Sequence, residues 1–364
     1  MGAGITSAAV AYSHYVEPFD IEFERIPIRL ARAQGKLPKS GLRILQLSDS
    51  HFHGGKRTLR ERMKIETVRR LTADLEYDLL IHTGDFWHDS EGLDNVLALL
   101  DAVPKPRLGS FGVFGNHDYA HFDMGVAPKR MWKTYNERVP LKDPTPIRFI
   151  KHVLNWIVYF RNTPLDGPPT QSNDANGLRT VLEDWGMRIL HNEAIHLQGL
   201  VENNSAVNQS RTVWHTNGQT VSNGSVDSPI QTAIAHSSKA ASEPVEIYLA
   251  GVDDWAMGRP NMAKAIRGIP TDAPLILLSH NPDIIEDGNL SRADLVISGH
   301  THGGQLVVPF WGPAHTQSAQ LGRHEVAGYT RRGKTQIYIS RGMGEGIPLR
   351  FMAHPQITLI TIKE

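Results

Sequence analysis

Five apolar segments of strand length, spread along the sequence, each end at residues that commonly bind metal ions. A short apolar run that stops at polar residues or glycine is typical of a buried strand followed by a loop. Sheets of the α/β class carry their ligand sites beyond the carboxyl ends of the strands, so this pattern predicts an α/β fold with one site built from several strand ends. The predicted strands and the polar residues that follow them are 42–47 with Asp49 and His51, 78–83 with Asp85, 108–114 with Asn116, His117 and Asp118, 274–279 with His280, and 294–298 with His300 and His302.

Composition narrows the chemistry that these residues can carry out. The chain has 364 residues, of which 40% are hydrophobic, enough for one large domain or two smaller ones with buried cores. Lys and Arg together number 38, as do Asp and Glu, so no global field draws the chain to nucleic acid or to a membrane. The absence of cysteine excludes disulfides, thiolate nucleophiles and thiolate metal sites. Metal binding is therefore left to His, Asp, Glu and Asn.

The chain is expected to form one main domain. Residues 1–40 are predicted to be an N-terminal tail and a lead-in strand, and residues 41–364 a single domain with insertions near 121–175 and 203–242. The first 15 residues are too short and too weakly apolar to span a bilayer, which needs about 20 residues, so a frayed tail is the preferred interpretation. The polar stretch 203–242 is typical of a long surface loop or a frayed hairpin. Residues 58–76 are predicted to be helical and 245–250 to be a strand.

A second interruption, residues 129–161, is basic and rich in apolar side chains. It holds eight Lys and Arg residues against Glu137 and Asp143, a net charge of 8 − 2 = +6. Because it follows the predicted site loop at His117, we expect it to overhang the site. The preferred interpretation is a lid or flanking helix that packs its apolar residues on the domain. The alternative is a surface that binds an amphiphilic phosphoester or an anionic membrane.

The order of the polar motifs is more specific than any one of them. In sequence they are Asp49-Ser50-His51, Gly84-Asp85, Gly115-Asn116-His117-Asp118, His280 and Gly299-His300-Thr301-His302. In this order the chain resembles the calcineurin-like metallophosphoesterase superfamily from about residue 42 to residue 364. The segments 278–283, 299–305 and 338–344 look most similar to its bacterial YkuE/YaeI-type phosphodiesterases, with Ser50 standing where a leucine is usual. The resemblance implies a four-layer αββα sandwich with two facing mixed β-sheets.

The resemblance also implies two divalent metal ions, Mn, Fe or Zn, with Asp85 as the bridging ligand. Asp49, His51 and His302 would complete the site of one ion, and Asn116, His280 and His300 that of the other. Alternate residues of an extended chain point to the same side, which suits the 49/51 and 300/302 pairs. Mixed nitrogen and oxygen ligands favour Mn, Fe or Zn over Mg or Ca. By the same resemblance His117 protonates or stabilises the leaving oxygen, and Asp118 orients His117.

Several neighbouring residues receive less specific interpretations. His53, His82 and His88 lie close to the motifs but outside them, and we expect them to be packing or solvated histidines. Arg341 is expected either to reach a substrate phosphate or to form an exposed salt bridge. Gly303 and Gly304 are expected to permit a tight turn beside the metals.

The predicted function is hydrolysis of a phosphodiester by attack of a metal-bridging hydroxide. A lipid-linked or nucleotide-lipid substrate is one hypothesis, since UDP-diacylglucosamine hydrolases share the superfamily. A nuclease or cyclic-nucleotide phosphodiesterase is the nearest alternative, although the neutral net charge does not favour nucleic acid. A non-enzymatic metal-binding scaffold is the third. We expect no nucleic-acid partner, infer no protein partner, and leave open peripheral contact with a membrane.

Overall fold

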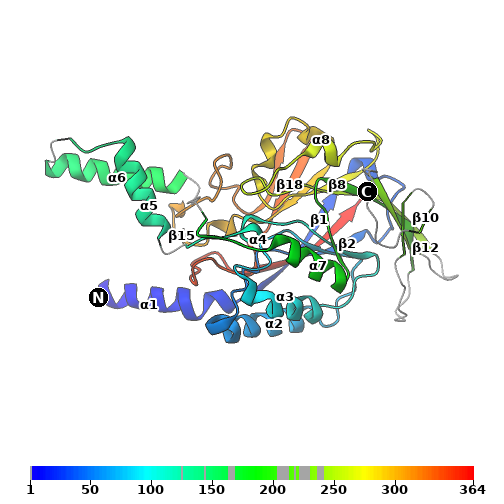
Figure 1. Cartoon of the computed structure of the whole chain (residues 1–364), viewed down its shortest axis with the longest axis horizontal. Helices are drawn as coiled ribbons and strands as arrows, with labels where there is room; N and C mark the ends of the chain where they lie inside the picture. The colour runs from blue at the N-terminus through cyan, green and yellow to red at the C-terminus, as the bar shows by residue number, and fades with distance from the viewer. Residues whose placement is uncertain are drawn as a thin grey trace.

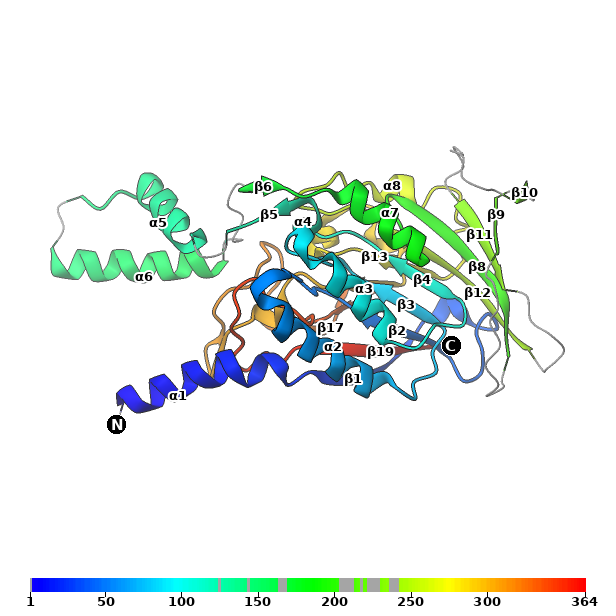
Figure 2. The ribbon, with the colours of Figure 1, turned by 60° about the horizontal axis from the view of Figure 1, so that its bottom comes forward.

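The computed structural model describes residues 2–123, 126–142, 145–162, 169–202, 213–216, 219–220, 230–235 and 242–364. Two large mixed β-sheets face each other, and helices cover their outer faces (Figures 1 and 2). This is the predicted αββα arrangement. The division into a lead-in segment and one domain stays a prediction.

The first sheet holds the strand ends of the N-terminal motifs. Its order is β1-β19-β2-β3-β4-β7. The strands β2, β3, β4 and β7 are parallel, so their carboxyl ends meet at one edge. β19 runs antiparallel to β2 and pairs in parallel with β1. The bounds are β1 Glu22–Arg29, β2 Leu42–Leu47, β3 Leu79–His82, β4 Gly109–Gly112, β7 Met187–Ile189 and β19 Gln356–Lys363.

The second sheet holds the strand ends of the C-terminal motifs. Its order is β10-β9-β11-β8-β12-β13-β14-β18-β17, and β12, β13, β14 and β18 are parallel. The bounds are β8 Glu193–Glu202, β9 Val213–Thr216, β10 Gln219–Thr220, β11 Ile230–Ala235, β12 Ser242–Gly251, β13 Leu275–Leu278, β14 Leu295–Ser298, β17 Gly328–Arg332 and β18 Thr335–Ile339. Two short pairs lie outside both sheets, β5 Ala120–His121 with β6 Gln171–Ser172 and β15 Val307–Val308 with β16 Gly312–Pro313.

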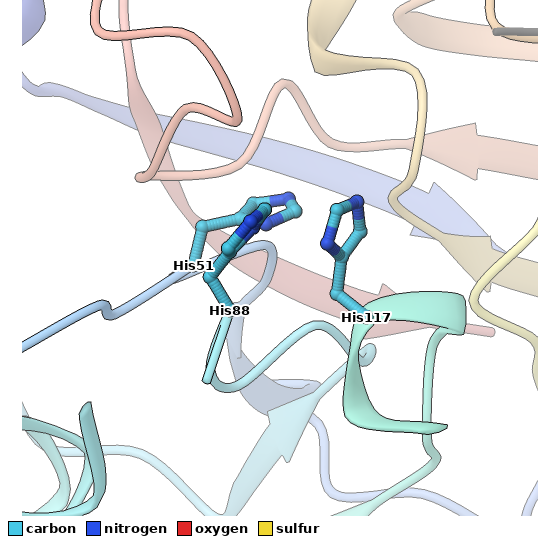
Figure 3. Close-up of side chains that lie close together, drawn as sticks. All are labelled: His51, His88 and His117. Atoms are coloured by element: carbon cyan, nitrogen blue, oxygen red, sulfur yellow. The ribbon is translucent and has the colours of Figure 1, made fainter. Parts of the chain in front are cut away.

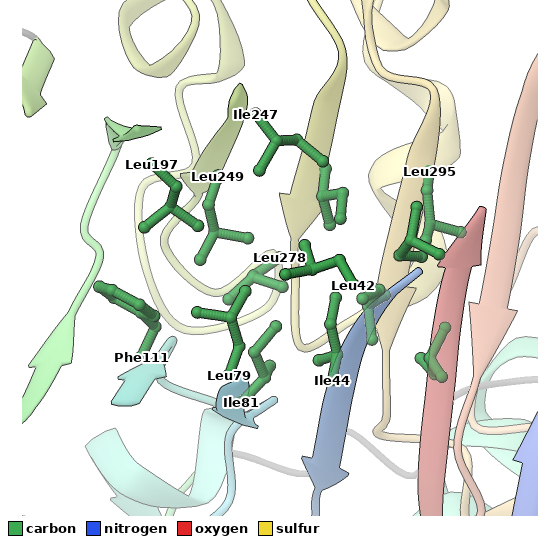
Figure 4. Close-up of a cluster of buried hydrophobic side chains, with 14 of the residues drawn as sticks. Leu42, Ile44, Leu79, Ile81, Phe111, Leu197, Ile247, Leu249, Leu278 and Leu295 are labelled. Carbon is green, nitrogen blue, oxygen red and sulfur yellow. The ribbon is translucent and has the colours of Figure 1, made fainter. Parts of the chain in front are cut away.

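Three apolar clusters hold the layers together. The central cluster fills the space between the sheets with side chains such as Ile81, Phe111 and Leu278 (Figure 4). A second lies between the first sheet and its helices, and a third lies under the second sheet, where α8 packs. The helices are α1 Gly2–Tyr15, α2 Thr58–Thr72, α3 Leu93–Ala102, α4 Asn116–Tyr119, α5 Ala127–Arg138, α6 Pro146–Asn162, α7 Ala175–Trp185 and α8 Met262–Ala265.

The five strands predicted before the motifs are confirmed as β2, β3, β4, β13 and β14. The predicted strand 245–250 lies within β12, and the predicted helix 58–76 is α2, which ends at Thr72. Within 203–242, the described residues before β12 form the strands β9, β10 and β11 rather than a loop. The other residues of this stretch lie outside the described part of the chain, and so does Asp143.

The N-terminal segment is a helix, so the expectation of a frayed tail is wrong for Gly2–Tyr15. Its last turn is tied to the body of the protein. The Ser13 carbonyl accepts a hydrogen bond from the Arg350 amide, at 2.9 Å, and His14 Nδ1 lies 2.7 Å from the Pro348 carbonyl oxygen. No helix within the described ranges combines the length and the apolar character needed to cross a membrane.

The basic insertion is a helical hairpin, α5–α6, that stands off from the sandwich (Figures 1 and 2). Its two helices pack on each other through aromatic rings: Trp132 meets Trp156 at 5.1 Å between ring centroids, and Tyr135 meets Tyr159 at 5.3 Å. The expectation of a lid that packs its apolar residues on the domain is therefore wrong for the described residues. The two helices bury one apolar face of the hairpin against each other, and another apolar face stays exposed.

Burial in the central cluster predicts how much the free energy of unfolding falls when a side chain there is shortened. Ile81→Ala removes buried methyl and methylene groups from a fully buried site, so we expect it to lower the free energy of unfolding by about 2–5 kcal/mol. Urea denaturation followed by circular dichroism measures the change. Leu59→Ala, at a side chain that is 75% exposed, is the control and should shift stability by no more than about 0.5 kcal/mol. Equal losses in the two variants would contradict this assignment of the core.

Candidate metal centre

Five of the predicted ligands lie in the left-handed region of backbone conformation. Asp49, His51, Asp85, His300 and His302 have φ between 46° and 71°. This region is unfavourable for residues other than glycine and persists only where surrounding contacts enforce it. The Asp49 amide donates to the Gly84 carbonyl at 2.9 Å, and the His51 amide donates to the Asp85 carbonyl at 3.0 Å. The turns at the strand ends are thus cross-linked, and they hold the side chains toward one place.

The Asp85 carboxylate lies between two groups of histidines. Its Oδ2 is 3.3 Å from His51 Nε2 and 3.2 Å from His280 Nε2. Its Oδ1 accepts a hydrogen bond from the His117 amide at 2.8 Å. The side chain is 2% exposed, so solvent contributes little to balancing its charge. Among the described carboxylates, Asp85 is therefore the one that lies within 3.3 Å of an imidazole of each group.

The first group joins the turn after β2 to the turn after β14. His51 Nε2 and His302 Nε2 are 3.0 Å apart, and Asp49 Oδ1 is 3.7 Å from His302 Nε2. The Asp49 carboxylate is held from behind, because Ser48 Oγ donates to its Oδ2 at 2.5 Å and the His300 amide donates to its Oδ1 at 2.9 Å. The ligand atoms of these three side chains all lie within 4.8 Å of one another.

The second group brings the turns after β4, β13 and β14 together. His300 Nδ1 lies 3.1 Å from Asn116 Oδ1 and 3.2 Å from His280 Nε2. The ligand atoms of Asp85, His280 and His300 lie within 4.8 Å of one another. The outer nitrogens of both imidazoles face backbone carbonyls: His280 Nδ1 is 2.7 Å from the Thr83 oxygen, and His300 Nε2 is 3.0 Å from the Gln317 oxygen. A proton on each outer nitrogen leaves the inner lone pair free for a metal.

The donor set fits divalent transition metals. With protons on their outer nitrogens, neutral His280 and His300 face each other with two lone pairs at 3.2 Å, and His51 Nδ1 has no hydrogen-bond partner in the described part of the chain. Cations placed against these lone pairs and the two carboxylates would satisfy them together. Nitrogen and oxygen donors in this proportion suit Mn, Fe or Zn.

Protonation states in the metal-free chain reflect the same need for positive charge. Burial opposes a charged His280, but Asp85, Asp49 and Asp254 raise its pKa to about 10. Burial also opposes ionisation of Asp85, yet the nearby imidazoles, His280 foremost, hold its pKa well below its usual range. Burial raises the pKa of Asp49 to about 6. A proton on His280 thus balances the Asp85 charge that a metal ion would otherwise balance.

His117 lines the site, and no hydrogen bond among the described residues joins its ring to Asp118. The Asp118 carboxylate accepts hydrogen bonds from the backbone amides of Gly115, Asp85 and Phe86 at 2.8, 2.9 and 2.8 Å. His117 Nδ1 is buried and has no hydrogen-bond partner among the described residues. The orienting role of Asp118 therefore stays a prediction, without a direct hydrogen bond to His117 in its support. Asp118 instead fastens the Gly84-Asp85 turn to the start of α4.

His88 lies closer to the centre than the sequence indicates. Its ring lies 4.7 Å from the His117 ring and 6.1 Å from the His51 ring, centroid to centroid (Figure 3). The three side chains form a further group whose ligand atoms lie within 4.8 Å of one another. Asn173, just before α7, donates to the carbonyls of both His88 and His117, at 3.0 and 2.8 Å. No spacing rule connects Asn173 with the motifs, so only the tertiary structure reveals it.

The other residues singled out beside the motifs pack, pair or turn the chain near the site. His82 is a packing histidine, stacked on Phe86 at 3.7 Å between centroids. Its Nε2 lies 2.9 Å from Ser50 Oγ, so the unusual serine contacts His82. Arg341 forms a salt bridge with Glu22. Gly303 and Gly304 have φ of 63° and 81° and form the expected tight turn.

The site opens through a small pocket. Phe122, Gln305, Gln317 and Gly346 line it together with six of the proposed site residues. A Cβ on Gly115 would come within 2.3 Å of Asp85 Oδ1, so glycine is required where α4 approaches the carboxylate. The six site residues that line the pocket are His51, Asp85, Asn116, His117, His300 and His302.

Comparison with known proteins gives a consistent picture. The family model of the calcineurin-like phosphoesterases matches residues 42–304. The UDP-2,3-diacylglucosamine pyrophosphatase LpxG of Chlamydia muridarum is 24% identical over 350 residues, which cover 92% of this chain and 88% of that protein. The uncharacterized metallophosphoesterase YkuE of Bacillus subtilis is 38% identical over 119 residues, 32% of this chain and 41% of YkuE. The phosphodiesterase YaeI of Escherichia coli is 37% identical over 89 residues, 24% of this chain and 32% of YaeI.

Buried histidines predict how stability of the metal-free protein depends on pH. Burial lowers their pKa values below the unfolded value of about 6.5, so below that pH the unfolded chain binds more protons and the native state loses stability. Four groups act in the opposite direction but are fewer than the seven histidines: Asp49 and Asp254, each with a pKa raised to about 6, His280, with a pKa raised to about 10, and Asp118, with a pKa raised well above its usual range. The histidines are His51, His53, His82, His88, His117, His300 and His302.

We therefore expect the Tm of the chelator-treated protein to fall as pH is lowered from 7 to about 5, the range in which the unfolded histidines titrate. Scanning calorimetry at several pH values measures it. A Tm that stays constant or rises over this range would contradict the burial of these imidazoles in the neutral form.

Proposed function

We propose that this chain, which belongs to the calcineurin-like phosphoesterase family and is a phosphoric ester hydrolase, cleaves phosphodiester or phosphoanhydride bonds with two divalent metal ions bridged by Asp85. The observation that carries the proposal is the position of the Asp85 carboxylate, within 3.3 Å of an imidazole of each ligand group. In this assignment Asp49, His51 and His302 hold one ion, and Asn116, His280 and His300 hold the other.

The two ions, when bound, would neutralise the phosphoryl oxygens and lower the pKa of water. The chain's own residues do the rest. The cross-linked turns hold the ligands in place, and the buried floor of the site excludes bulk water, which strengthens every charge interaction there. His117 lines the pocket and is placed to donate a proton to the leaving oxygen. Burial lowers the pKa of the His117 imidazole to about 4, and the negative charge of a bound phosphate would raise it again.

A lipid-linked substrate is the finer part of the proposal. The relative LpxG, which aligns along most of both chains, is named for cleavage of UDP-2,3-diacylglucosamine. A substrate of this class presents a compact pyrophosphate to the metals and its acyl chains to the surroundings of the pocket. The exposed apolar side chains of α6 and of the β15–β16 turn suit such chains.

Two other functions are less well supported. A nuclease would track a polyanionic strand with a basic groove, whereas the side chains that line the pocket include no Lys or Arg. A non-enzymatic scaffold would tolerate loss of ligands, but all seven proposed ligands are gathered at one site, together with His117.

The catalytic assignment predicts separate effects of two substitutions. With bis(p-nitrophenyl) phosphate and added Mn, Fe, Zn or Mg, His117→Ala should lower kcat by roughly 10²–10⁴-fold while the bound metal content is unchanged. Asp85→Ala should lose both activity and metal. His196→Ala is the control, because its ring stacks on Tyr248 and, among the described residues, no contact joins it to the site. Full activity in His117→Ala would contradict its role, as would wild-type activity in a metal-free preparation.

The substrate assignment predicts a preference among diesters. The wild-type protein should turn over a nucleoside diphosphate linked to a diacylated sugar with a higher kcat/KM than bis(p-nitrophenyl) phosphate, cyclic nucleotides or single-stranded DNA, because the acyl chains add binding energy. Assays of all four under identical metal loading measure this. Faster hydrolysis of cyclic nucleotides or DNA would replace the lipid-linked substrate with the alternative.

A further inference from the structure

The outer face of α6 carries an exposed apolar stripe. Ile147, Ile150, Leu154 and Val158 follow one another at intervals of three, four and four residues, which places them on one side of a helix. They are 80%, 59%, 57% and 55% exposed. The opposite side of the helix packs its aromatic rings on α5. Because water disfavours a continuous row of four large aliphatic side chains, this stripe indicates a surface that is covered in use.

Positive charge accompanies the stripe. Lys151 is four residues after Ile147 and three before Leu154, so it borders the stripe directly, and Arg148 lies one turn before Lys151. Among the described residues of the hairpin, Glu137 is the one acidic side chain, and it pairs with Lys133 at 3.9 Å. The exposed basic side chains of the hairpin are Lys129, Arg130, Lys133, Arg138, Lys142, Arg148 and Lys151.

Two further elements expose apolar residues on the same side of the molecule. Figure 1 places β15 between the α5–α6 hairpin and α1, and both ribbon views show α1 and the hairpin projecting from one end of the sandwich. The β15–β16 turn carries Phe310, fully exposed, and Trp311, 47% exposed. The last turn of α1 carries Tyr12 and Tyr15, 39% and 68% exposed.

All three elements are connected in sequence or by a contact to segments that hold pocket-lining residues. Phe122 precedes α5, and the Phe160 ring of α6 lies 5.4 Å from that of His315. Gln305 and Gln317 lie on either side of the β15–β16 pair in sequence. Gly346 lies two residues before Pro348, whose carbonyl is 2.7 Å from His14 Nδ1. The three apolar surfaces are therefore connected to segments that line the pocket.

We propose that α6, the β15–β16 turn and the end of α1 form a docking surface for an anionic lipid bilayer, with the pocket turned toward the membrane. The aliphatic stripe inserts among the acyl chains, the basic residues contact the headgroup phosphates, and the tyrosines and Trp311 lie at the interface. Charge complementarity selects this occupant: a dimer through α6 would bring two basic hairpins together and bury like charges.

The docking proposal rests on the proposed function, because the membrane would deliver the lipid-linked substrate. Vesicle binding itself does not require catalysis. The experiment therefore uses metal-free full-length protein in sedimentation with vesicles of phosphatidylglycerol and phosphatidylcholine, or of phosphatidylcholine alone. Hydrolysis of bis(p-nitrophenyl) phosphate by the metal-loaded protein is measured separately. Absence of that hydrolysis would contradict the proposed function and leave the docking surface standing.

We expect binding to the anionic vesicles and much weaker binding to the neutral ones. Ile150→Gln/Leu154→Gln should weaken it by about tenfold or more, because two buried aliphatic side chains are lost. Arg148→Gln/Lys151→Gln should weaken it by about tenfold through loss of two headgroup contacts. The matched controls, Leu59→Gln/Met63→Gln and Arg69→Gln/Arg70→Gln on α2, should bind as the wild type does. All variants should hydrolyse the soluble diester normally.

Three results would overturn the proposal. They are no vesicle binding by the wild type, equal binding by the α6 variants and the wild type, and a dimer in sedimentation velocity that Ile150→Gln/Leu154→Gln dissolves without any vesicle binding. The last result would make the stripe a contact between two copies of this chain.

Discussion

The carboxylate of Asp85 is the point on which the site depends. It is buried between two groups of imidazoles, and an isolated negative charge in such a place is strongly unfavourable unless cations balance it. In the metal-free chain a proton on His280 supplies that positive charge, since the pKa of this histidine is raised to about 10. Divalent ions would replace the proton and satisfy the facing lone pairs as well.

The fold positions this carboxylate by joining two sheets at their strand ends. The turns after β2, β3 and β14 hold their ligands in left-handed backbone conformations, and hydrogen bonds between the turns enforce that strain. Asp118 contributes in the same way, by accepting the amides of Gly115, Asp85 and Phe86. Behind the first ligand group, Arg350 is fully buried and donates to the carbonyls of Arg341, Gly342 and Gly344, so the loop near His302 is fixed by one guanidinium.

The sequence pattern predicts an α/β fold whose strand ends meet at one site, and the resemblance to the family implies the two facing sheets and the ligand set. An apolar strand that ends at a ligand residue is visible without coordinates, and parallel pairing brings such ends together, as for Asp49 and Asp85. What depends on tertiary contacts is not visible in this way. Adjacency of Asp118 to His117, for example, says nothing of side-chain direction, and the Asp118 carboxylate bonds to backbone amides instead. His88 and Asn173 approach the centre only through folding, and the direction in which α6 turns its apolar stripe depends on its packing against α5.

The surroundings of the pocket suit the proposed hydrolysis of an amphiphilic phosphoester. The buried, cross-linked residues of the proposed metal centre line a small pocket, and the apolar and basic elements are connected to segments that line it. Such a site suits a substrate whose phosphates are compact and whose remainder is amphiphilic.

The most direct test of the account is electron paramagnetic resonance of the protein loaded with Mn²⁺, with the metal content measured on the same sample. Two ions joined by the Asp85 carboxylate should give an exchange-coupled spectrum and a stoichiometry near two per chain, and Asp85→Asn should lose the coupling. A wild-type spectrum of isolated Mn²⁺, or one ion per chain at saturation, would contradict the dinuclear centre.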